Sequence, residues 1–193
     1  MKIYLMIFSH DFFTEIYLFF DYDGHADIAN DEKLTKMLTH FNNETDEGKL
    51  YISYPMVEAL KHIESNVCFK NTNTTAKEKI GYKQLVSQVG ASDYMHITRY
   101  DLETWHRLIK IHGMKLNFIV NEEYCFPNRY ISQEEIFTSQ LDKHITPSNN
   151  VAVLSAFPIL IIDYYGINEI HKRIDLKKTQ DYSSSEYAQV ALT

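Results

Sequence analysis

The feature that most constrains this chain is an apolar segment, Ile16 to Phe20, that runs directly into Asp21 and Asp23. Five consecutive apolar residues predict a buried strand, and Gly24 ends it. Ligands of open α/β sheets bind at the carboxyl ends of the strands. The two acids therefore stand where such a sheet would place a binding site.

Two interpretations of Asp21 and Asp23 are open at this point. Hard divalent cations prefer oxygen ligands, and Mg²⁺ in proteins takes one or two carboxylates together with substrate phosphates. The alternative is a solvated turn in which the acids cap the next helix, a common role for Asp. The pattern alone predicts either a site for Mg²⁺ or Mn²⁺ or an ordinary acidic turn.

Composition limits the class of protein. The chain has 193 residues, is 45% hydrophobic and has a formal net charge of −7, which is typical of one folded domain, or of one with a small insert. Such a charge excludes a surface that is basic throughout, so contact with nucleic acid needs a local basic patch or a bridging metal. Cys68 and Cys125 lack the spacing of a zinc site or a CxxC pair. With no membrane-spanning segment in the pattern, we expect a cytoplasmic protein with reduced thiols.

The hydrophobic pattern changes along the chain. The first third alternates strands and helices, and the remainder shows helical periodicity only. The expected strands are Lys2–Phe8, Ile16–Asp23 and Lys49–Tyr54, and the expected helices are Asn30–Phe41, one opened by Pro55, Lys77–Val89, Asp101–Val120, Ser132–Ile145, Asn150–Tyr165 and Asn168–Ile174. The predicted fold class is therefore an α/β amino-terminal portion with a partial sheet, followed by a mainly helical domain.

A polar stretch, Asn71–Thr75, is typical of a linker between these parts. The predicted division is an α/β domain over 1–70, a helical domain over 76–174 and a flexible tail over 175–193. Asp101 and Ser132 are expected N-caps, the latter in a capping box with Glu135. A stripe at helical spacing predicts a core-facing side of one helix. Its members are Leu102, Trp105, Ile109, Leu116 and Ile119.

Glu58 is the third candidate acid. It follows the strand that ends at Tyr54 and lies in the first turn of the helix expected after Pro55. If this strand and the one ending at Asp21 are parallel neighbours, all three acids lie at one sheet edge. Three carboxylates there would repel unless a cation or shared protons compensate. The alternative is that Glu58 has no role in a site and is there because the helix dipole stabilises an acidic side chain in the first turn.

Four successive segments resemble the RloB-like and AbiL-like abortive-infection proteins of the Toprim fold. They are Phe20–Asp23, the helix after it, the strand Leu50–Tyr54 and the run Tyr54–Leu60. Those proteins have an Asp-x-Asp strand end and a Pro-x-x-Glu helix start after the next strand. The resemblance covers about Ile16 to Ile63, and Leu154–Gly166 fits the helical carboxyl part less specifically. It implies a Mg²⁺-dependent nuclease of a bacterial phage-defence system, with a partner ATPase.

The resemblance also implies a further Glu, in a Glu-Gly context, on a strand before the Asp pair. The 20 residues before Asp21 contain no Glu-Gly, and Glu15 does not replace it. We therefore expect a truncated or degenerate member. This leaves an alternative in which the chain is a non-catalytic interaction subunit of a defence complex.

A second resemblance is to the haloacid-dehalogenase phosphohydrolases. Phe19–Gly24 is similar to their first motif, which implies Asp21 as nucleophile and Asp23 as general acid/base. Ser53 and Asp163 would stand for their second and fourth motifs. His25 replaces the usual Thr of the first motif, and no strand–helix alternation follows Ala76.

A local excess of lysine follows Glu58 and is the chain's best candidate for a phosphate-steering patch. A solvated lysine-rich face is the alternative. These residues are Lys61, Lys70, Lys77, Lys79 and Lys83.

Overall fold

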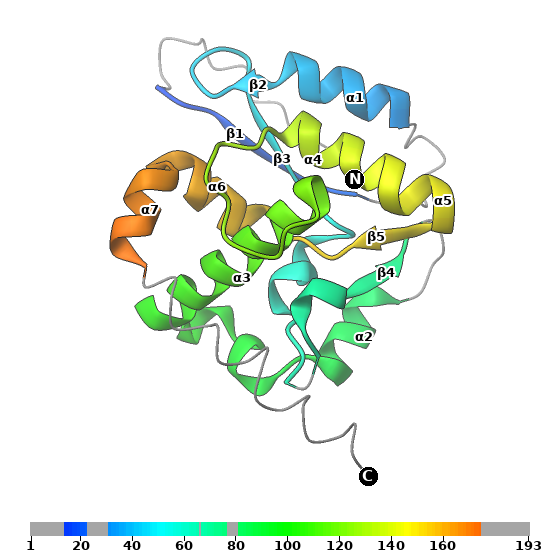
Figure 1. Cartoon of the computed structure of the whole chain (residues 1–193), viewed down its shortest axis with the longest axis vertical. Helices are drawn as coiled ribbons and strands as arrows, with labels where there is room; N and C mark the ends of the chain where they lie inside the picture. Colours follow the sequence, from blue (N-terminus) through cyan, green and yellow to red (C-terminus); the bar gives the residue numbers. More distant parts are fainter. Residues whose placement is uncertain (1–13, 23–30, 66, 77–80, 175–193) are drawn as a thin grey trace.

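The computed structural model describes residues 14–22, 31–65, 67–76 and 81–174. A small sheet lies between helices, with α1 and α4 on one side and α6 on the other (Figure 1). The helices are α1 (Asp31–His40), α2 (Tyr82–Val89), α3 (Leu102–Asn121), α4 (Gln133–Gln140), α5 (Thr146–Ser148), α6 (Ala156–Tyr165) and α7 (Ile167–Arg173). Within the described ranges, none of them is long and apolar enough to cross a lipid bilayer.

The first sheet has the strand order β1-β3-β2, where β1 is Tyr17–Asp21, β2 is Asn42–Asn43 and β3 is Gly48–Ser53. β1 and β3 are parallel, and α1 lies between them in sequence, so the three form a β–α–β unit. β2 pairs antiparallel with β3. The fold class is as predicted: a small mixed sheet in the amino-terminal portion, followed by a mainly helical region. The strand expected at Lys2–Phe8 lies outside the described residues.

The segment predicted as a linker is a strand, and part of a predicted helix is its partner. β4 (Asn73–Thr75) pairs antiparallel with β5 (Asn150–Ala152). Thr72 and Thr74 are buried while Asn71 and Asn73 are exposed, the two-residue period of a strand. A polar composition hid this alternation, because Thr is both polar and β-branched. The helix expected over 150–165 begins only at Ala156.

The predicted helix starts are confirmed at two places. The Asp101 carboxylate accepts a 2.8 Å hydrogen bond from the Thr104 N–H at the start of α3. Ser132 and Glu135 form the full capping box of α4. Each cap satisfies N–H groups that a first helical turn leaves without a partner.

The core-facing stripe of α3 is confirmed except at its first member. Ile109, Leu116 and Ile119 are buried, and Trp105 packs partly buried against a smaller cluster. Leu102 is 71% exposed. It is the first residue of α3, and it does not belong to the buried face.

One hydrophobic cluster contains residues from both sides of the predicted 70/76 boundary. Tyr22 and Leu50 belong to it, as do Leu116, Ile136 and Leu154. The two sheets are joined by a backbone bridge in which Tyr54 N–H donates to Leu154 O at 2.8 Å and Leu154 N–H donates to Tyr54 O at 3.0 Å. The predicted tail over 175–193 lies outside the described residues.

A buried lysine fixes the segment that leads into β4. Lys115 of α3 is fully buried, and its ammonium donates to Lys70 O at 2.6 Å, Thr72 O at 3.0 Å and Asn73 Oδ1 at 3.5 Å. Burial lowers the pKa of Lys115 to about 7, and the charge of Cys68 acts in the opposite direction. An ammonium has three donors, and three acceptors face it here.

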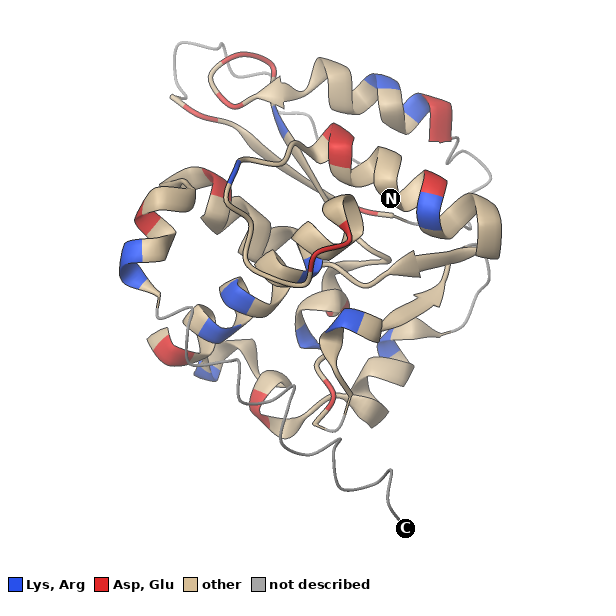
Figure 2. Cartoon of the chain, in the orientation of Figure 1, with Lys and Arg blue, Asp and Glu red and all other residues tan. Residues whose placement is uncertain are grey.

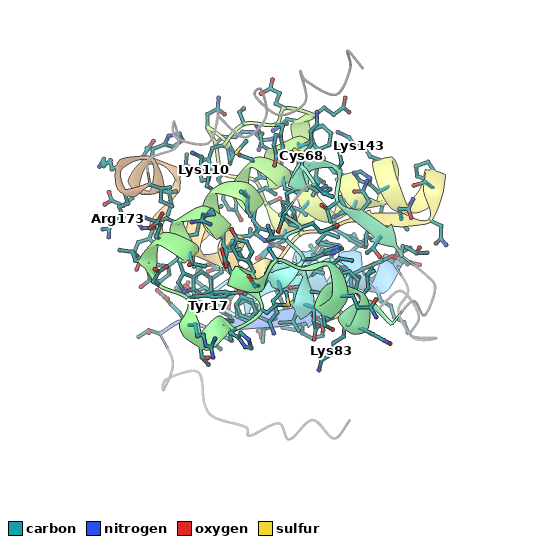
Figure 3. The ribbon with its side chains drawn as sticks, turned by 90° about the horizontal axis from the view of Figure 1, so that it is seen from below. Tyr17, Cys68, Lys83, Lys110, Lys143 and Arg173 are labelled. Carbon is teal, nitrogen blue, oxygen red and sulfur yellow. The ribbon has the colours of Figure 1, made fainter. Side chains whose placement is uncertain are left out.

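We expect Lys115→Met to lower the free energy of unfolding by about 2 kcal/mol, because the Lys70 and Thr72 carbonyls each lose a hydrogen bond from the ammonium. Lys143 is the matched control: it is partly exposed and donates to Val120 O at 2.8 Å. Lys143 and Cys68 are labelled on the upper side of the view in Figure 3. Lys143→Met should change stability by less than about 1 kcal/mol in urea unfolding. Equal losses in the two variants would contradict the role given to Lys115.

Candidate functional site

The carboxyl edge of β1 and β3 brings together residues that are far apart in the sequence. The register pairs Asp21 with Ser53, and the Tyr22 N–H donates to Ser53 O at 2.9 Å. The condition set for the three acids to share an edge, that these two strands are parallel neighbours, is therefore met. Asp21 ends its strand beside the point where the chain leaves β3 toward Glu58.

Strand alternation directs Asp21 toward α6. Phe19 stacks on Tyr51 at 5.8 Å and on Phe157 of α6 at 4.9 Å between ring centroids. Side chains two residues apart on a strand share a face, so Asp21 is on the face of Phe19. On this face the Ser53 hydroxyl accepts a 3.2 Å hydrogen bond from the Ala156 N–H, in the first turn of α6. The acid thus ends its strand on the side where the positive end of the α6 dipole lies.

Glu58 lies in a short 3₁₀ helix, Val57–Lys61, rather than in an α-helix opened by Pro55. The Tyr54–Pro55 peptide bond is cis, and Met56 is the N-cap. This corrects the predicted helix start, because Pro55 lies in the turn that precedes the helix. Glu58 is half-buried, and its charge adds to burial in raising the pKa of Tyr82 on α2.

The predicted metal pair is only half described. Asp21 is exposed at the end of β1, whereas Asp23 lies outside the described residues. In the described ranges, no group of three or more His, Cys, Asp or Glu side chains is arranged to hold a metal ion. A site made by Asp21 and Asp23 stays a prediction.

A buried polar pair, His112 and Ser155, lies at the start of α6 beside this edge, and no motif in the sequence predicts it. His112 of α3 is fully buried, and its Nδ1 accepts a 3.2 Å hydrogen bond from the Ser155 N–H at the N-cap of α6. The Phe69 ring meets the imidazole edge-on at 4.7 Å. Burial, with a smaller effect from the Lys115 charge, lowers the pKa of His112 to about 3. The ring is therefore neutral at physiological pH, and it accepts rather than donates at Nδ1.

The structure does not bring the phosphohydrolase residues together. Asp163 lies in α6, not at a strand end, and it pairs with Lys49 and Tyr51. Lys49 is the second residue of β3, whereas Ser53 is its last. Lys49 and Ser53 are about 13 Å apart along β3, so the Lys49 partner of Asp163 lies at the opposite end of the strand from the residue beside Asp21.

The lysine-rich stretch is spread over several elements in the described ranges. Lys61, Lys70 and Lys83 lie on separate elements, while Lys77 and Lys79 fall outside the described residues. Lys70 lies over the Phe118 ring at 4.5 Å. Figure 2 shows basic and acidic residues interspersed over several elements. This distribution favours the interpretation of solvated surface lysines.

Comparison of the chain with protein-family models, with curated proteins and with solved structures gave no match. A function for this chain therefore has to be inferred from the geometry of the sheet edge and the acids that it presents.

His112 makes a specific prediction for acid unfolding. Its pKa is about 3 in the folded chain and about 6.5 when unfolded, so the unfolded chain binds more protons between these values. Stability should therefore fall as pH drops from 6.5 toward 3, with a His112 contribution of up to about 1.4 kcal/mol per pH unit. His112→Asn keeps an acceptor for Ser155 and removes this contribution. Urea unfolding over this pH range should show a shallower slope for the variant.

The control for this experiment is His96→Asn, because His96 is exposed. That variant should retain the pH dependence of the parent chain. An unchanged slope in His112→Asn would show that His112 is not the group that titrates.

Proposed function

We propose that this chain is a metal-dependent, nuclease-like cytoplasmic protein of a bacterial phage-defence system, with Asp21 and Asp23 as ligands for Mg²⁺ or Mn²⁺. The observation that supports it best is the parallel pairing of β1 and β3, with Asp21 and Ser53 in register at their carboxyl ends. Carboxyl ends of parallel strands are the usual ligand-binding edge of α/β sheets. The resemblance to Toprim-fold abortive-infection proteins supplies the reaction class.

The donor set at this edge fits a hard cation. Asp21 presents carboxylate oxygens from an exposed strand end, and the half-buried Glu58 follows the neighbouring strand. Mg²⁺ retains several waters and takes few protein carboxylates, so it does not require a closed cluster of ligands. The Ser53 hydroxyl is engaged with the Ala156 N–H, so we assign it to positioning α6 and not to the metal.

The residues around the edge have distinct proposed roles. Asp21 and Asp23 would bind the cation, and Glu58 would add charge or orient a ligand. The first turn of α6 is buried and its Ala156 N–H is bonded to the Ser53 hydroxyl, so we assign this turn to positioning the edge rather than to binding a phosphate. A bound Mg²⁺ or Mn²⁺ supplies stabilisation of charge on the attacking and leaving oxygens of a phosphodiester.

Asp21→Asn tests the metal site without changing side-chain size. We expect the Mn²⁺ dissociation constant, measured by titration calorimetry, to rise about tenfold or more because a ligand charge is lost. Asp46→Asn is the control, since Asp46 is exposed in the turn between β2 and β3. Its affinity for Mn²⁺ should equal that of the parent chain. Equal affinities in all three proteins would remove Asp21 from the site.

The same three proteins can be assayed for cleavage of single- and double-stranded DNA and RNA with Mg²⁺ or Mn²⁺. We expect metal-dependent cleavage that Asp21→Asn abolishes. Metal binding without cleavage of any nucleic acid would reject the nuclease and retain the site.

A second candidate function is a non-catalytic interaction subunit, and exposed aromatics on β1 favour it. Phe19 is 41% and Phe20 is 44% exposed, and in the described part of the chain β1 pairs on one side only, with β3. An unpaired strand edge with apolar side chains is a template for pairing with another chain. The partner implied by the resemblance is an ATPase encoded beside this chain.

Phe20→Lys tests this alternative. Capture of the neighbouring ATPase by the tagged chain should fall about tenfold, because a charge replaces an apolar contact, and chelation of divalent metal should have no effect. Ile97→Lys is the matched control, since Ile97 is 45% exposed in a separate 3₁₀ turn, Ile97–Arg99, which is not part of a sheet. Equal capture by both variants would exclude β1 as the interaction surface.

A further inference from the structure

A cavity of about 230 Å³ lies among α3, α6, the start of α7 and residues 127–131. Figure 1 shows α3 beside α6, with α7 following it. Most of the lining is apolar: Leu116, Pro127, Ile131, Ile159, Ile162 and Ile167. A cavity of about 150 Å³ with such a lining is already large enough to hold benzene.

This cavity is separate from the carboxyl edge of the sheet. Its lining includes Asp163, which pairs with Lys49 near the amino end of β3. Asp21 and Ser53 lie at the other end of the paired strands. The cavity therefore requires a ligand of its own and does not extend the candidate metal site.

The formal charges in the lining are already neutralised by partners in the protein. The Asp163 carboxylate accepts from Lys49 Nζ and from the Tyr51 hydroxyl, both at 2.5 Å. Arg129 donates to both oxygens of Glu135, at 2.8 Å and 3.2 Å. An ionised ligand would meet charges that already have partners, and in the apolar part of the cavity it would lack a counter-charge, which is costly.

Two features of the lining bear on the space inside the cavity. Lys49 lies over the Tyr130 ring at 5.2 Å from its centroid, which fixes an aromatic face in the wall. Gly166, between α6 and α7, has φ +76°, and a Cβ built there would meet no atom within 4 Å. A left-handed φ favours glycine, so the junction leaves open space where a side chain would otherwise stand.

We propose that this cavity is a binding site for a small uncharged molecule with an aromatic or aliphatic body. Its volume sets the size near that of a single substituted ring, its isoleucine-rich lining supplies the apolar contact, and its paired charges select against ions. Tyr130 also lines the cavity, and an aromatic side chain in the wall favours a planar ring. Apolar walls with a few polar groups are the usual composition of small-molecule sites.

The test uses three probes of matched size: benzyl alcohol, benzoate and benzylammonium. Each is titrated into the full chain while the Ile δ1 methyl resonances are followed by NMR. We expect benzyl alcohol to shift the resonances of Ile159, Ile162 and Ile167, with a dissociation constant of about 1 mM or lower. The two ions should bind at least about tenfold more weakly. Absence of these shifts with benzyl alcohol, or equal binding of either ion, would overturn the proposal.

A pair of variants separates the cavity from the rest of α6 and α7. Ile167→Trp fills the cavity and should abolish binding of benzyl alcohol. Ile161→Trp is the control, because Ile161 is also partly buried against the core but does not line the cavity. It should bind as the parent chain does. Unchanged binding in a folded Ile167→Trp would place the ligand elsewhere, and the probe series on the unmodified chain decides the case if that variant does not fold.

Discussion

The bridge between Tyr54 and Leu154 is the contact on which the rest of this structure depends. Two backbone hydrogen bonds join Tyr54, directly after β3, to Leu154, which follows β5 by two residues. A side-chain hydrogen bond lies beside this bridge: the hydroxyl of Ser53, which precedes Tyr54, accepts from the N–H of Ala156, two residues after Leu154. The bridge thus determines both the start of α6 and the side of the sheet on which that helix lies. The candidate metal edge and the cavity under the far end of α6 both depend on this one placement.

The parts predictable from sequence are those in which local signals agree. The apolar run before Asp21, the periodic apolar positions of α1 and the β-rich segment of β3 each indicate one type of element. The run before Asp21 is nevertheless not the buried strand predicted, because in the described part of the chain β1 lies at the edge of the sheet and leaves Phe19 41% and Phe20 44% exposed. The caps at Asp101 and Ser132 are equally local, since hydroxyl and carboxylate groups bond N–H groups of the same turn. Parallel pairing of β1 with β3 follows once α1 separates them, because parallel strands need a crossover.

The parts that sequence missed depend on partners distant in the chain. β4 is polar in composition, and only its pairing with β5, far along the chain, makes it a strand. Asp163 looks like a strand-end acid because apolar residues precede it, yet those residues face a core on several sides of α6. The sequence around Lys49, Arg129 and Asp163 does not indicate that their charges are paired, because the partners lie on other elements. The cavity has no linear signature at all.

The side chain of Gln140 takes the place of a neighbouring strand beside β5. Fully buried, it accepts from the Ala152 N–H at 2.9 Å and donates to Ala152 O at 2.7 Å, as a neighbouring strand would. One amide thereby blocks the outer hydrogen-bonding groups of β5 at this residue. Ala152 therefore cannot pair with a strand from another molecule, and the glutamine closes the β4–β5 ladder at this residue.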